Sequence, residues 1–314
     1  MNKIVVIGSS NTDLISKMEH FPIPGETIEG ESFFQTMGGK GANQALAAHK
    51  LGGNVQFVTS LGKDSNGKST MKYYKRAQLD VSLSLITDEI PSGTAMIWVD
   101  GKGENSIVIN SGANKMLSST YIDKIQKVIA EAYMVVLQLE IPYETVKRVC
   151  EIASRNKTKI FFNPAPAQRI DAEIIKMTDI LVVNETEARI ISGEKSGKLE
   201  QEKMIDRLRA MGAKTVILTL GKKGSIFKDG RTIISVPAFS VNAVDSTAAG
   251  DVFCGAIAAE LSKGSSWENA LEFATAASAI SVTKMGAQPS IPTEKEVLEF
   301  LKSNTLRIKA KADL

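Results

Sequence analysis

Short runs of β-branched and other apolar residues alternate with helical segments along most of this chain, and this alternation limits the fold more than any other feature. Between the runs, apolar residues recur with the 3.6-residue period of a helix that is buried on one face. Strands that alternate with helices pair in parallel, because each crossover helix returns the chain to the same end of the sheet. The expected strands are Ile4–Ile7, Val55–Thr59, Met134–Leu139, Lys159–Asn163, Ile180–Val183 and Thr215–Leu220.

The layers follow from the apolar character of these runs. The run AYMVVLQLE, residues 132–140, is almost continuously apolar, as a strand covered on both faces should be. We therefore expect an α/β fold of three layers, α/β/α, around a mostly parallel central sheet. Residues 12–36 and 91–110 differ, because they are interrupted by glycine and proline and alternate partly with period two, as in TAMIWV and NSIVIN. They predict a small second sheet within a single domain spanning residues 1–305. The basic tail, 306–314, is expected to be disordered.

Composition narrows the kinds of function. Of the 314 residues, 43% are apolar and 23% are charged, with a net charge of +3 and no basic stripe, which argues against a nucleic-acid partner. No apolar run has membrane-spanning length, and the chain starts with a strand-like segment rather than a secretion signal. Cys150 and Cys254 lie in apolar helical patterns, so we expect buried thiols and a cytoplasmic protein. His20 and His49 are the only histidines, so carboxylates must carry any acid–base chemistry.

The stretch VDSTAAGDVFCGA, residues 244–256, ends a polar loop and opens an apolar helix. Ala248, Ala249 and Gly250 are small enough for backbone N–H groups to approach an anion, and a helix start adds the positive end of its dipole. Asp251 would face a bound phosphate, where it is a poor ligand but a suitable base for a substrate hydroxyl. The residues alone leave two interpretations open, a phosphoryl-transfer site and an ordinary capped helix.

A second glycine-rich turn, MGGKGANQAL at residues 37–46, also leads into a helix of small residues, which suggests a second ligand. Ligands of open α/β sheets bind beyond the carboxyl ends of the strands, where Glu140, Asn163 and Asn184 fall. The carboxylate of Asp13, after a strand and a short polar turn, is suited to accept hydrogen bonds from two hydroxyl groups of a ligand. An ordinary turn aspartate would fit the same pattern.

Nine ordered segments resemble the ribokinase, or PfkB, family of carbohydrate kinases from one end of the chain to the other. They are IGSSNTDLI, PIPGETI, GGKGANQA, VVLQLEIP, NPAPA, VVNETEA, LTLG, VDSTAAGD and GAQPSIP. Each segment alone is a weak signal, whereas the ordered set is highly specific. The resemblance implies a ribokinase-like fold in which the small sheet forms a lid over a sugar site, and it implies transfer of the γ-phosphoryl group of ATP to a sugar with Mg²⁺ and activating K⁺. The exposed apolar residues of the lid would suit a homodimer contact.

The same resemblance assigns roles to matching positions. Asp251 is implied as the catalytic base, with the backbone of Ala248, Ala249 and Gly250 as the anion hole. The implied sugar-binding residues are Asn11, Asp13, Gly39, Lys40, Asn43, Glu140 and Asp251. The implied ATP-binding residues are Asn184, Thr219, Gly221 and Gly224, with Glu187 organising water around Mg²⁺. The implied K⁺ site comprises Asp245, Thr247, Ser281, Lys284, Gly286 and Ser290, several of them through backbone carbonyls.

Several of these residues also have ordinary structural explanations. Asn184 and Glu187 fit a capping box at a helix start, and this interpretation can hold together with the functional one. The turn at residues 219–224 fits a plain hairpin. Lys40 alone is typical of a helix-start lysine, and it would serve either the sugar or the charge of the transferred phosphate.

Residues 62–69, GKDSNGKS, match the phosphate-binding P-loop pattern between an expected strand and an expected helix. Asp64 argues against this function, because a carboxylate inside the loop would oppose phosphate. In the family this stretch is a GxDxxG turn. We expect a coincidental match in which Asp64 and Ser65 cap the helix.

The expected reaction is phosphorylation of the 5-hydroxyl of ribose. Asn11 favours ribose over 2-deoxyribose, because a missing substrate hydroxyl would leave its amide unpaired. Fructose-type and nucleoside substrates are further alternatives, although no aromatic pair near Asp13 supports a nucleoside base. A non-catalytic sugar sensor on the same scaffold is the other class of function, and the presence of Asp251 and the anion-hole residues argues against it.

Overall fold

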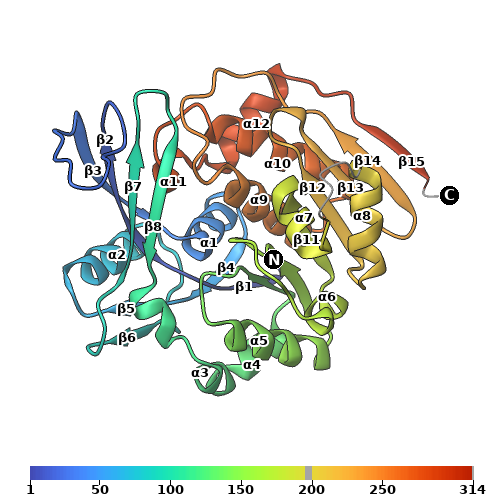
Figure 1. Ribbon diagram of the computed structural model, residues 1–314. Coiled ribbons are helices and arrows are strands. Elements are labelled where there is room, and N and C mark those ends of the chain that lie inside the picture. The colour runs from blue at the N-terminus through green and yellow to red at the C-terminus, as the bar shows by residue number, and fades with distance from the viewer. Residues whose placement is uncertain (195–199, 313–314) are drawn as a thin grey trace.

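A nine-stranded sheet runs through the centre of the computed structural model, which describes residues 1–194 and 200–312 (Figure 1). Its strand order is β15-β14-β13-β12-β11-β10-β9-β1-β4, parallel from β4 to β12 and antiparallel from β12 to β15. The strands are β1 (Lys3–Ile7), β4 (Asn54–Val58), β9 (Met134–Leu137), β10 (Lys159–Phe162), β11 (Ile180–Asn184), β12 (Thr215–Thr219), β13 (Ser225–Lys228), β14 (Thr232–Val236) and β15 (Lys309–Ala312). All six strands expected from the sequence are present, with ends within two residues of the prediction.

Helices cover both faces of the sheet, which confirms the three-layer prediction. One face carries α1 (Lys40–Lys50), α2 (Ser65–Arg76), α9 (Ala249–Lys263), α10 (Trp267–Ser281) and α12 (Glu294–Ser303). The other carries α3 (Ser119–Lys124), α4 (Gln126–Glu131), α5 (Tyr143–Arg155), α6 (Ala172–Met177), α7 (Glu185–Ser192) and α8 (Gln201–Ala210). Within β1, Ile4 and Val6 pack in the first core while Val5 and Ile7 pack in the second, as the two-residue period of a strand requires.

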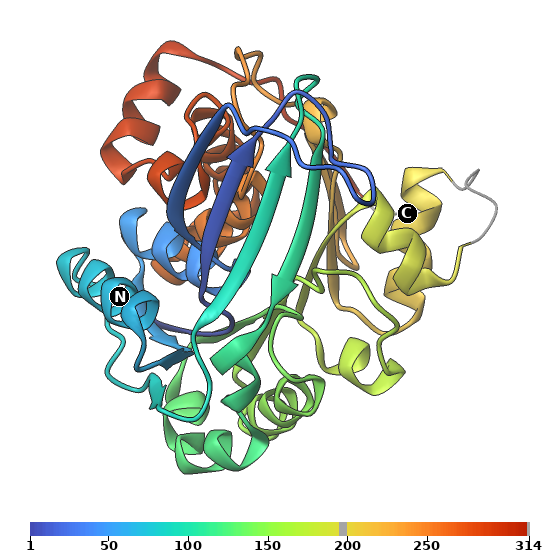
Figure 2. The same cartoon turned by 60° about the vertical axis from the view of Figure 1, so that its left-hand side comes forward.

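A smaller four-stranded sheet stands beside this core (Figure 2). Its order is β3-β2-β7-β8, with β2 (Asn11–Lys17), β3 (Ser32–Gly38), β7 (Gly93–Val99) and β8 (Asn105–Asn110). These strands come from the two extended segments that interrupt the α/β alternation. Because β2 follows β1 closely and β3 leads directly into α1, the small sheet begins at the carboxyl edge of the central sheet.

Short elements complete the described chain. A two-stranded sheet pairs β5 (Ser60–Gly62) with β6 (Leu85–Thr87), and α11 (Ala287–Ser290) lies between α10 and α12 in the sequence. The 3-10 helices are η1 (Gly112–Met116) and η2 (Gly221–Lys223). Among the residues that the structure describes, no helix combines the length and apolar character needed to cross a membrane.

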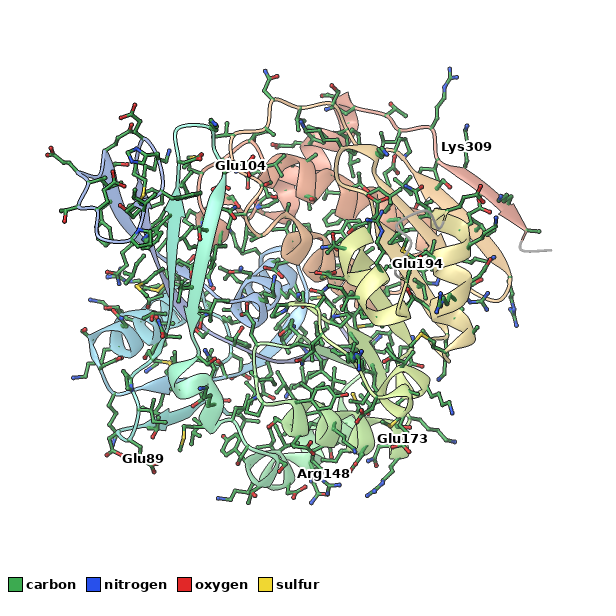
Figure 3. The ribbon with its side chains drawn as sticks, in the orientation of Figure 1. Glu89, Glu104, Arg148, Glu173, Glu194 and Lys309 are labelled. Carbon is green, nitrogen blue, oxygen red and sulfur yellow. The ribbon has the colours of Figure 1, made fainter. Side chains whose placement is uncertain are left out.

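The C-terminal tail differs from its expected disorder. Residues Lys309–Ala312 form β15, which pairs antiparallel with β14 at the edge of the central sheet. Figure 3 labels Lys309 on this outer strand. All four residues of the strand are exposed, so the pattern of buried and exposed side chains did not predict it. The strand is held by backbone hydrogen bonds to the edge strand β14. Positions 313 and 314 lie outside the described residues.

Candidate active site

A cavity of about 230 Å³ lies where the carboxyl ends of β10, β11 and β12 meet the first turns of α1, α7 and α9. Eight of its lining residues were predicted from the sequence as site residues: Lys40, Asn184, Glu187, Thr219, Ala248, Ala249, Gly250 and Asp251. The lining also includes Asn163, Ala165, Val182, Val183, Ser246 and Cys254. The two glycine-rich turns of the sequence therefore meet at one site.

Asp251 lies in the first turn of α9 and is 6% exposed. Two amides from α1 hold its carboxylate. Asn43 Nδ2 donates to Oδ2 over 2.9 Å, and Gln44 Nε2 donates to Oδ1 over 3.0 Å. Both carboxylate oxygens therefore have a fixed donor from the protein. The structure thus holds a buried carboxylate in one orientation at the cavity wall.

The N-terminus of α9 has no side-chain cap. Ala248 occupies the N-cap position with φ of 60°, a left-handed conformation that costs a non-glycine residue about 1 kcal/mol. The N–H of Ala249 donates to the carbonyl of Ser246 over 3.2 Å. Within the described chain, the N–H groups of Ala248 and Gly250 have no acceptor, so this helix start can bind an anion.

The N-terminus of α1 is organised differently, because a carboxylate of the protein already occupies it. Glu140 Oε2 accepts hydrogen bonds from Ser9 Oγ and from the backbone N–H of Lys40, the latter over 3.0 Å. Gly39 precedes the helix with φ of 90°, and a Cβ there would lie 2.8 Å from Asn11 N. Glu140, which follows the carboxyl end of β9, therefore holds the GGKGAN turn in position.

Asp13 lies on β2 of the small sheet and is 6% exposed. Its carboxylate accepts no hydrogen bond from any residue that the structure describes. Burial, together with the charges of Glu140 and Asp251, raises the pKa of Asp13 from its ordinary value of 3.8 to about 7. A buried carboxylate without a protein donor is suited to a ligand that brings its own hydroxyl donors.

Lys40 balances these carboxylates. Burial alone would lower its pKa, but Asp251, Glu140 and Glu187 outweigh burial and raise it. Burial also raises the pKa of Glu187, against the hydrogen bond from Asn184 and the charge of Lys40. Lys40 therefore stays charged among the carboxylates of Asp251, Glu140 and Glu187.

Asn11 is oriented by a residue that the sequence did not single out. Asn114 Nδ2, from η1, donates to Asn11 Oδ1 over 2.8 Å, and Asn114 Oδ1 accepts from the backbone N–H of Ser10 over 2.9 Å. With its oxygen engaged, the amide of Asn11 has its Nδ2 group to offer to a ligand.

The expected nucleotide residues serve local structure as well. Asn184 and Glu187 form a reciprocal capping box at the start of α7, as one of the two interpretations predicted. Thr219 ends β12, and η2 connects it to the antiparallel β13, so the expected hairpin is present. A Cβ on Gly224 would lie 1.9 Å from the carbonyl oxygen of Val236, whereas none lies within 4 Å at Gly221. Gly224 is thus required by packing, and Gly221 is the glycine with free space around it.

The residues expected around K⁺ come from the loop before α9 and from the segment between the end of α10 and the end of α11, and these two segments contact each other. Asp245 Oδ1 accepts from the N–H and Oγ1 of Thr247, and its Oδ2 accepts from the N–H of Gly286 over 2.8 Å. Ser281 and Ser290 are buried, with hydroxyls that donate to backbone carbonyls. The ammonium of Lys284 pairs with Glu296 over 2.9 Å, which leaves only its carbonyl as a cation ligand. The oxygen-rich loops fit a hard cation.

Few side chains of the site could bind a divalent metal ion. Among the described residues, no group of three or more histidine, cysteine or carboxylate side chains could hold a metal ion. Glu187 and Asp251 are the carboxylates that line the cavity. This donor set fits Mg²⁺ that keeps several waters and binds phosphate oxygens, rather than a metal in a cage of protein ligands.

The P-loop match lies elsewhere, beside a cavity of about 730 Å³ lined largely by α2. As predicted, Asp64 caps this helix: it accepts from Gly67 N over 2.8 Å, and it also accepts from Ser92 N and Oγ. Burial alone would raise the pKa of Asp64, but these hydrogen bonds outweigh burial and lower the pKa below its ordinary value. Ser65, which was predicted to cap the helix together with Asp64, is instead its first helical residue. The lining of this larger cavity comprises four lysines, Arg76, Met71, Ile86 and two glycines, and it contains no carboxylate.

Two polar residues at the site, Gln44 and Gln138, were missed as candidate site residues. Both are buried, and they form a hydrogen-bonded chain with Asp251 and with Asn163, which the sequence had placed at the ligand-binding edge of the sheet. Gln44 lies inside the GGKGANQA segment and Gln138 inside VVLQLEIP, so a buried amide in each segment was the available signal.

Comparisons with known proteins agree with this geometry. The model of the pfkB family carbohydrate kinases matches residues 1–294. The ribokinase of Haemophilus influenzae is 40% identical over 301 residues, which are 95% of this chain and 98% of that protein. The deoxyribokinase of Salmonella typhi is 36% identical over 306 residues, 96% of this chain and 99% of that protein. The structure of Arabidopsis thaliana ribokinase complexed with ribose and ATP superposes with a TM-score of 0.89 at 32% identity, covering 96% of this chain and 99% of that one.

This chain therefore belongs to the pfkB family of carbohydrate kinases.

Proposed function

We propose that this protein transfers the γ-phosphoryl group of ATP to the 5-hydroxyl of D-ribose, giving ribose 5-phosphate and ADP. One observation carries this conclusion. Asp251 stands at an open helix start on one side and within electrostatic reach of the unpartnered carboxylate of Asp13 on the other. The first feature suits a phosphate and the second suits a polyhydroxylated substrate. The similarity to ribokinases, one of them complexed with ribose and ATP, supports this pair of substrates.

Asp251 acts as the base. The proton of the 5-hydroxyl passes to its carboxylate while the hydroxyl oxygen bonds to the γ-phosphorus and the bond from that phosphorus to the bridging oxygen of ADP breaks. The amides of Asn43 and Gln44 aim the carboxylate before the substrate arrives. Pre-orientation matters because a misplaced reacting group loses much of the advantage of an intramolecular step.

Backbone N–H groups of residues 248–250 stabilise the charge that develops on the transferred phosphoryl group. The N–H of Ala249 would have to leave the carbonyl of Ser246 to take part. Lys40 adds a positive charge between the two substrates. Mg²⁺, when bound, would neutralise phosphate charge, and Glu187 would hold it through water.

Asn184, Thr219, Gly221 and Gly224 would contact the nucleotide. Asn184 and Thr219 end adjacent parallel strands and pair with each other in the ladder, so they lie together at the cavity. Gly221, with open space around it, lets a ribose or phosphate approach the backbone. K⁺ would be held by the loops that contain Asp245 and Gly286, next to the anion-binding turn.

Ribose is the preferred sugar in this proposal because the amide of Asn11 is held by Asn114 as a donor. A 2-deoxy sugar would leave a buried donor without a partner, which costs about 1–3 kcal/mol. Because the chain is also similar to a protein named deoxyribokinase, this amide is the feature that we expect to separate the two sugars.

The small sheet closes over the sugar and excludes water in this proposal. Its outer surface carries a patch of exposed apolar side chains, which suits a homodimer contact through the two lids. The patch consists of Phe33, Met96, Trp98 and Val108, which the strand register places on one face, whereas the exposed Ile107 and Ile109 lie on the face that carries Asp13. Glu104 marks the tip of the β7–β8 hairpin at the end of this sheet (Figure 3). The expectation of a cytoplasmic protein stays a prediction.

The test is ADP release with ATP, Mg²⁺ and K⁺ in the presence of ribose, 2-deoxyribose, fructose, adenosine or no sugar. Turnover with ribose well above all other sugars is the expected result. Preference for another sugar would change the proposed substrate but leave the proposed phosphoryl transfer from ATP in place. Hydrolysis of ATP that does not depend on sugar would contradict the proposal.

A further inference from the structure

Three buried amides connect the carboxyl end of β9 to the first turn of α9. Gln138 Nε2 donates to Gln44 Oε1 over 2.6 Å. Gln44 Nε2 donates both to Asp251 Oδ1 and to Asn163 Oδ1, each over 3.0 Å. Gln44 and Gln138 are fully buried, and Asn163 is 8% exposed. Side chains from β9, the end of β10, α1 and α9 thus meet in one polar chain inside the protein.

The chemistry at the two ends fixes the direction of this chain. An ionised Asp251 only accepts, so Gln44 must turn its NH₂ group toward it. Asn163 Nδ2 donates to the carbonyl of Val182 over 2.9 Å, and its own oxygen therefore also faces the NH₂ group of Gln44. Gln44 Oε1 then has to accept, and Gln138 is the donor that it meets. A flipped Gln44 would place three oxygens together, which makes the observed orientation the stable one.

Close backbone packing brings Gln44 within reach of Asp251. A Cβ on Gly255 of α9 would lie 2.7 Å from the backbone oxygen of Gln44 and 2.6 Å from the Cβ of Ala47. Without a side chain at Gly255, α9 lies directly against α1 (Figure 1). At the other end, a Cβ on Gly8 would lie 2.1 Å from Gln138 Oε1. Glycines at both points let the amides span the gap between β9 and α9.

The two oxygens of Asp251 consequently have different surroundings. Oδ1 faces the interior amide Gln44, while Oδ2 accepts from Asn43. Asn43 is 5% exposed, and its Oδ1 is buried without a partner in the described chain, so it has an acceptor left for a ligand hydroxyl. Oδ2 is therefore the oxygen on the substrate side.

We propose that Gln44 is a positioning residue for phosphoryl transfer: it anchors Oδ1 of Asp251 so that Oδ2 meets the sugar hydroxyl, and Gln138 anchors Gln44. This inference rests on the proposed role of Asp251 as the base. Neither glutamine is among the residues that line the cavity. Their effect falls on the rate of the chemical step rather than on the affinity for sugar or ATP, because they fix the direction in which an existing carboxylate points.

The first test is Gln44→Met, which keeps an unbranched side chain of similar length and removes both hydrogen-bonding functions. Single-turnover phosphoryl transfer is measured by rapid quench, and ribose and ATP-analogue affinities are measured by calorimetry. The expected result is a transfer rate lower by about 10- to 100-fold, with both affinities within about threefold of the parent protein. An unchanged transfer rate would overturn the proposal.

Gln56→Met is the matched control. Gln56 is 5% exposed, lies on β4, donates to Ser82 and has an unpartnered buried oxygen, so its replacement imposes a similar loss of a buried amide away from the cavity. The control is expected to keep its transfer rate. Gln138→Met, one hydrogen bond further from Asp251, is expected to lower the transfer rate by about 3- to 10-fold at constant ribose affinity. It also keeps the proposal testable if Gln44→Met does not fold, since an unchanged rate in this variant would overturn it.

A double-mutant cycle with Asp251→Asn separates positioning from general damage. If Gln44 acts through Asp251, Gln44→Met has little further effect on the residual rate of Asp251→Asn. An equal loss in both backgrounds would overturn the positioning role while leaving Asp251 as the base. Parent-level turnover in Asp251→Asn alone would overturn the proposed function itself, so the two failures are distinguishable.

Discussion

The starts of α1 and α9 have the same kind of sequence, a glycine- and alanine-rich turn before a helix of small residues. They differ in whether a side chain of the protein accepts hydrogen bonds from their backbone N–H groups. At α1 the backbone N–H of Lys40 is satisfied by Glu140, and Gly38 and Gly39 are buried. At α9 the turn is partly exposed, no side chain caps it, and N–H groups of Ala248 and Gly250 remain without acceptors in the described chain.

This difference separates the two substrates. A helix start that already holds a carboxylate repels further negative charge, so the α1 turn suits neutral hydroxyls with Asp13 and Asn43 as partners. A helix start with free donors attracts an anion, so the α9 turn suits phosphate. Asp251 belongs to the second turn by sequence and to the first by its hydrogen bond from Asn43. It is therefore the residue at which sugar and phosphate meet.

The largest expected effect comes from Asp251→Asn. Removing the base should lower turnover by about 10²- to 10⁴-fold, because that is the usual contribution of general-base catalysis. Steady-state kinetics and calorimetry measure it, with ribose affinity expected to change little. Turnover at the level of the parent protein would show that Asp251 is not the residue at which the sugar and the phosphate react.

Asp13→Asn should weaken ribose binding by about 100-fold, because charge-assisted hydrogen bonds contribute about 1.5–3 kcal/mol each. In the parent protein, ribose affinity should fall as the pH drops below about 7, where Asp13 becomes protonated. Calorimetry between pH 5.5 and 8.5, conditions chosen on the order of one to two units around that pKa, measures both effects. A pH-independent ribose affinity would contradict the assignment of Asp13.

The same substitution should stabilise the ligand-free protein. The folded pKa of Asp13, about 7, lies above its ordinary value of 3.8, so the folding stability from this group is fully present below pH 3.8 and is lost as the pH rises through about 7. Asp13→Asn should therefore raise the melting temperature more at pH 8 than at pH 5. Equal gains at both pH values would show that the carboxylate is not strained by burial.

Gly250→Ala tests the difference between the turn before α9, which has free N–H donors in the described chain, and the turn before α1, which is bound by Glu140. No atom lies within 4 Å of the new Cβ, so the fold should keep its melting temperature, while the methyl group obstructs phosphate and lowers turnover about 10-fold. Gly39→Ala is the contrasting variant, because its Cβ would lie 2.8 Å from Asn11 N at a φ of 90°. It should destabilise the protein. Equal melting temperatures for the two variants would undermine the comparison.

Smaller effects are expected outside the two turns. Glu187→Gln should keep the capping box, which tolerates glutamine, but raise the Mg²⁺ concentration needed for half-maximal turnover by a few-fold. A lower melting temperature at an unchanged Mg²⁺ requirement would leave Glu187 with a structural role alone.

Lys68→Ala should leave turnover and nucleotide affinity unchanged, because Asp64 occupies the start of α2. Loss of nucleotide binding in this variant would revive the P-loop interpretation.

The sequence predicted the parallel core well, because most residues of the strands from β1 to β12 in the central sheet are apolar and buried, although β4 also carries the polar residues Asn54 and Gln56. It predicted the two turns because glycines and a junction carboxylate are visible in a linear pattern. The contrast between the turns was not predictable, since Glu140 reaches the start of α1 from 100 residues away. The contact of Gln44 with Asp251 spans 207 residues and exists only through the packing of α1 on α9.

The tail shows a different limit. Its residues Lys309–Ala312 alternate lysine with alanine, but none of their side chains is buried and the four residues lack large apolar side chains, so the pattern was too weak to predict β15. The strand forms because β14 would otherwise present an unpaired edge.

The most direct test of the account is to titrate ribose and a non-hydrolysable ATP analogue separately into Asp13→Asn and Gly250→Ala by calorimetry. The account predicts opposite losses: Asp13→Asn binds the ATP analogue and loses ribose, whereas Gly250→Ala binds ribose and loses affinity for the ATP analogue. If both variants lost the same ligand, the two turns would not divide the substrates, and the central claim would be wrong.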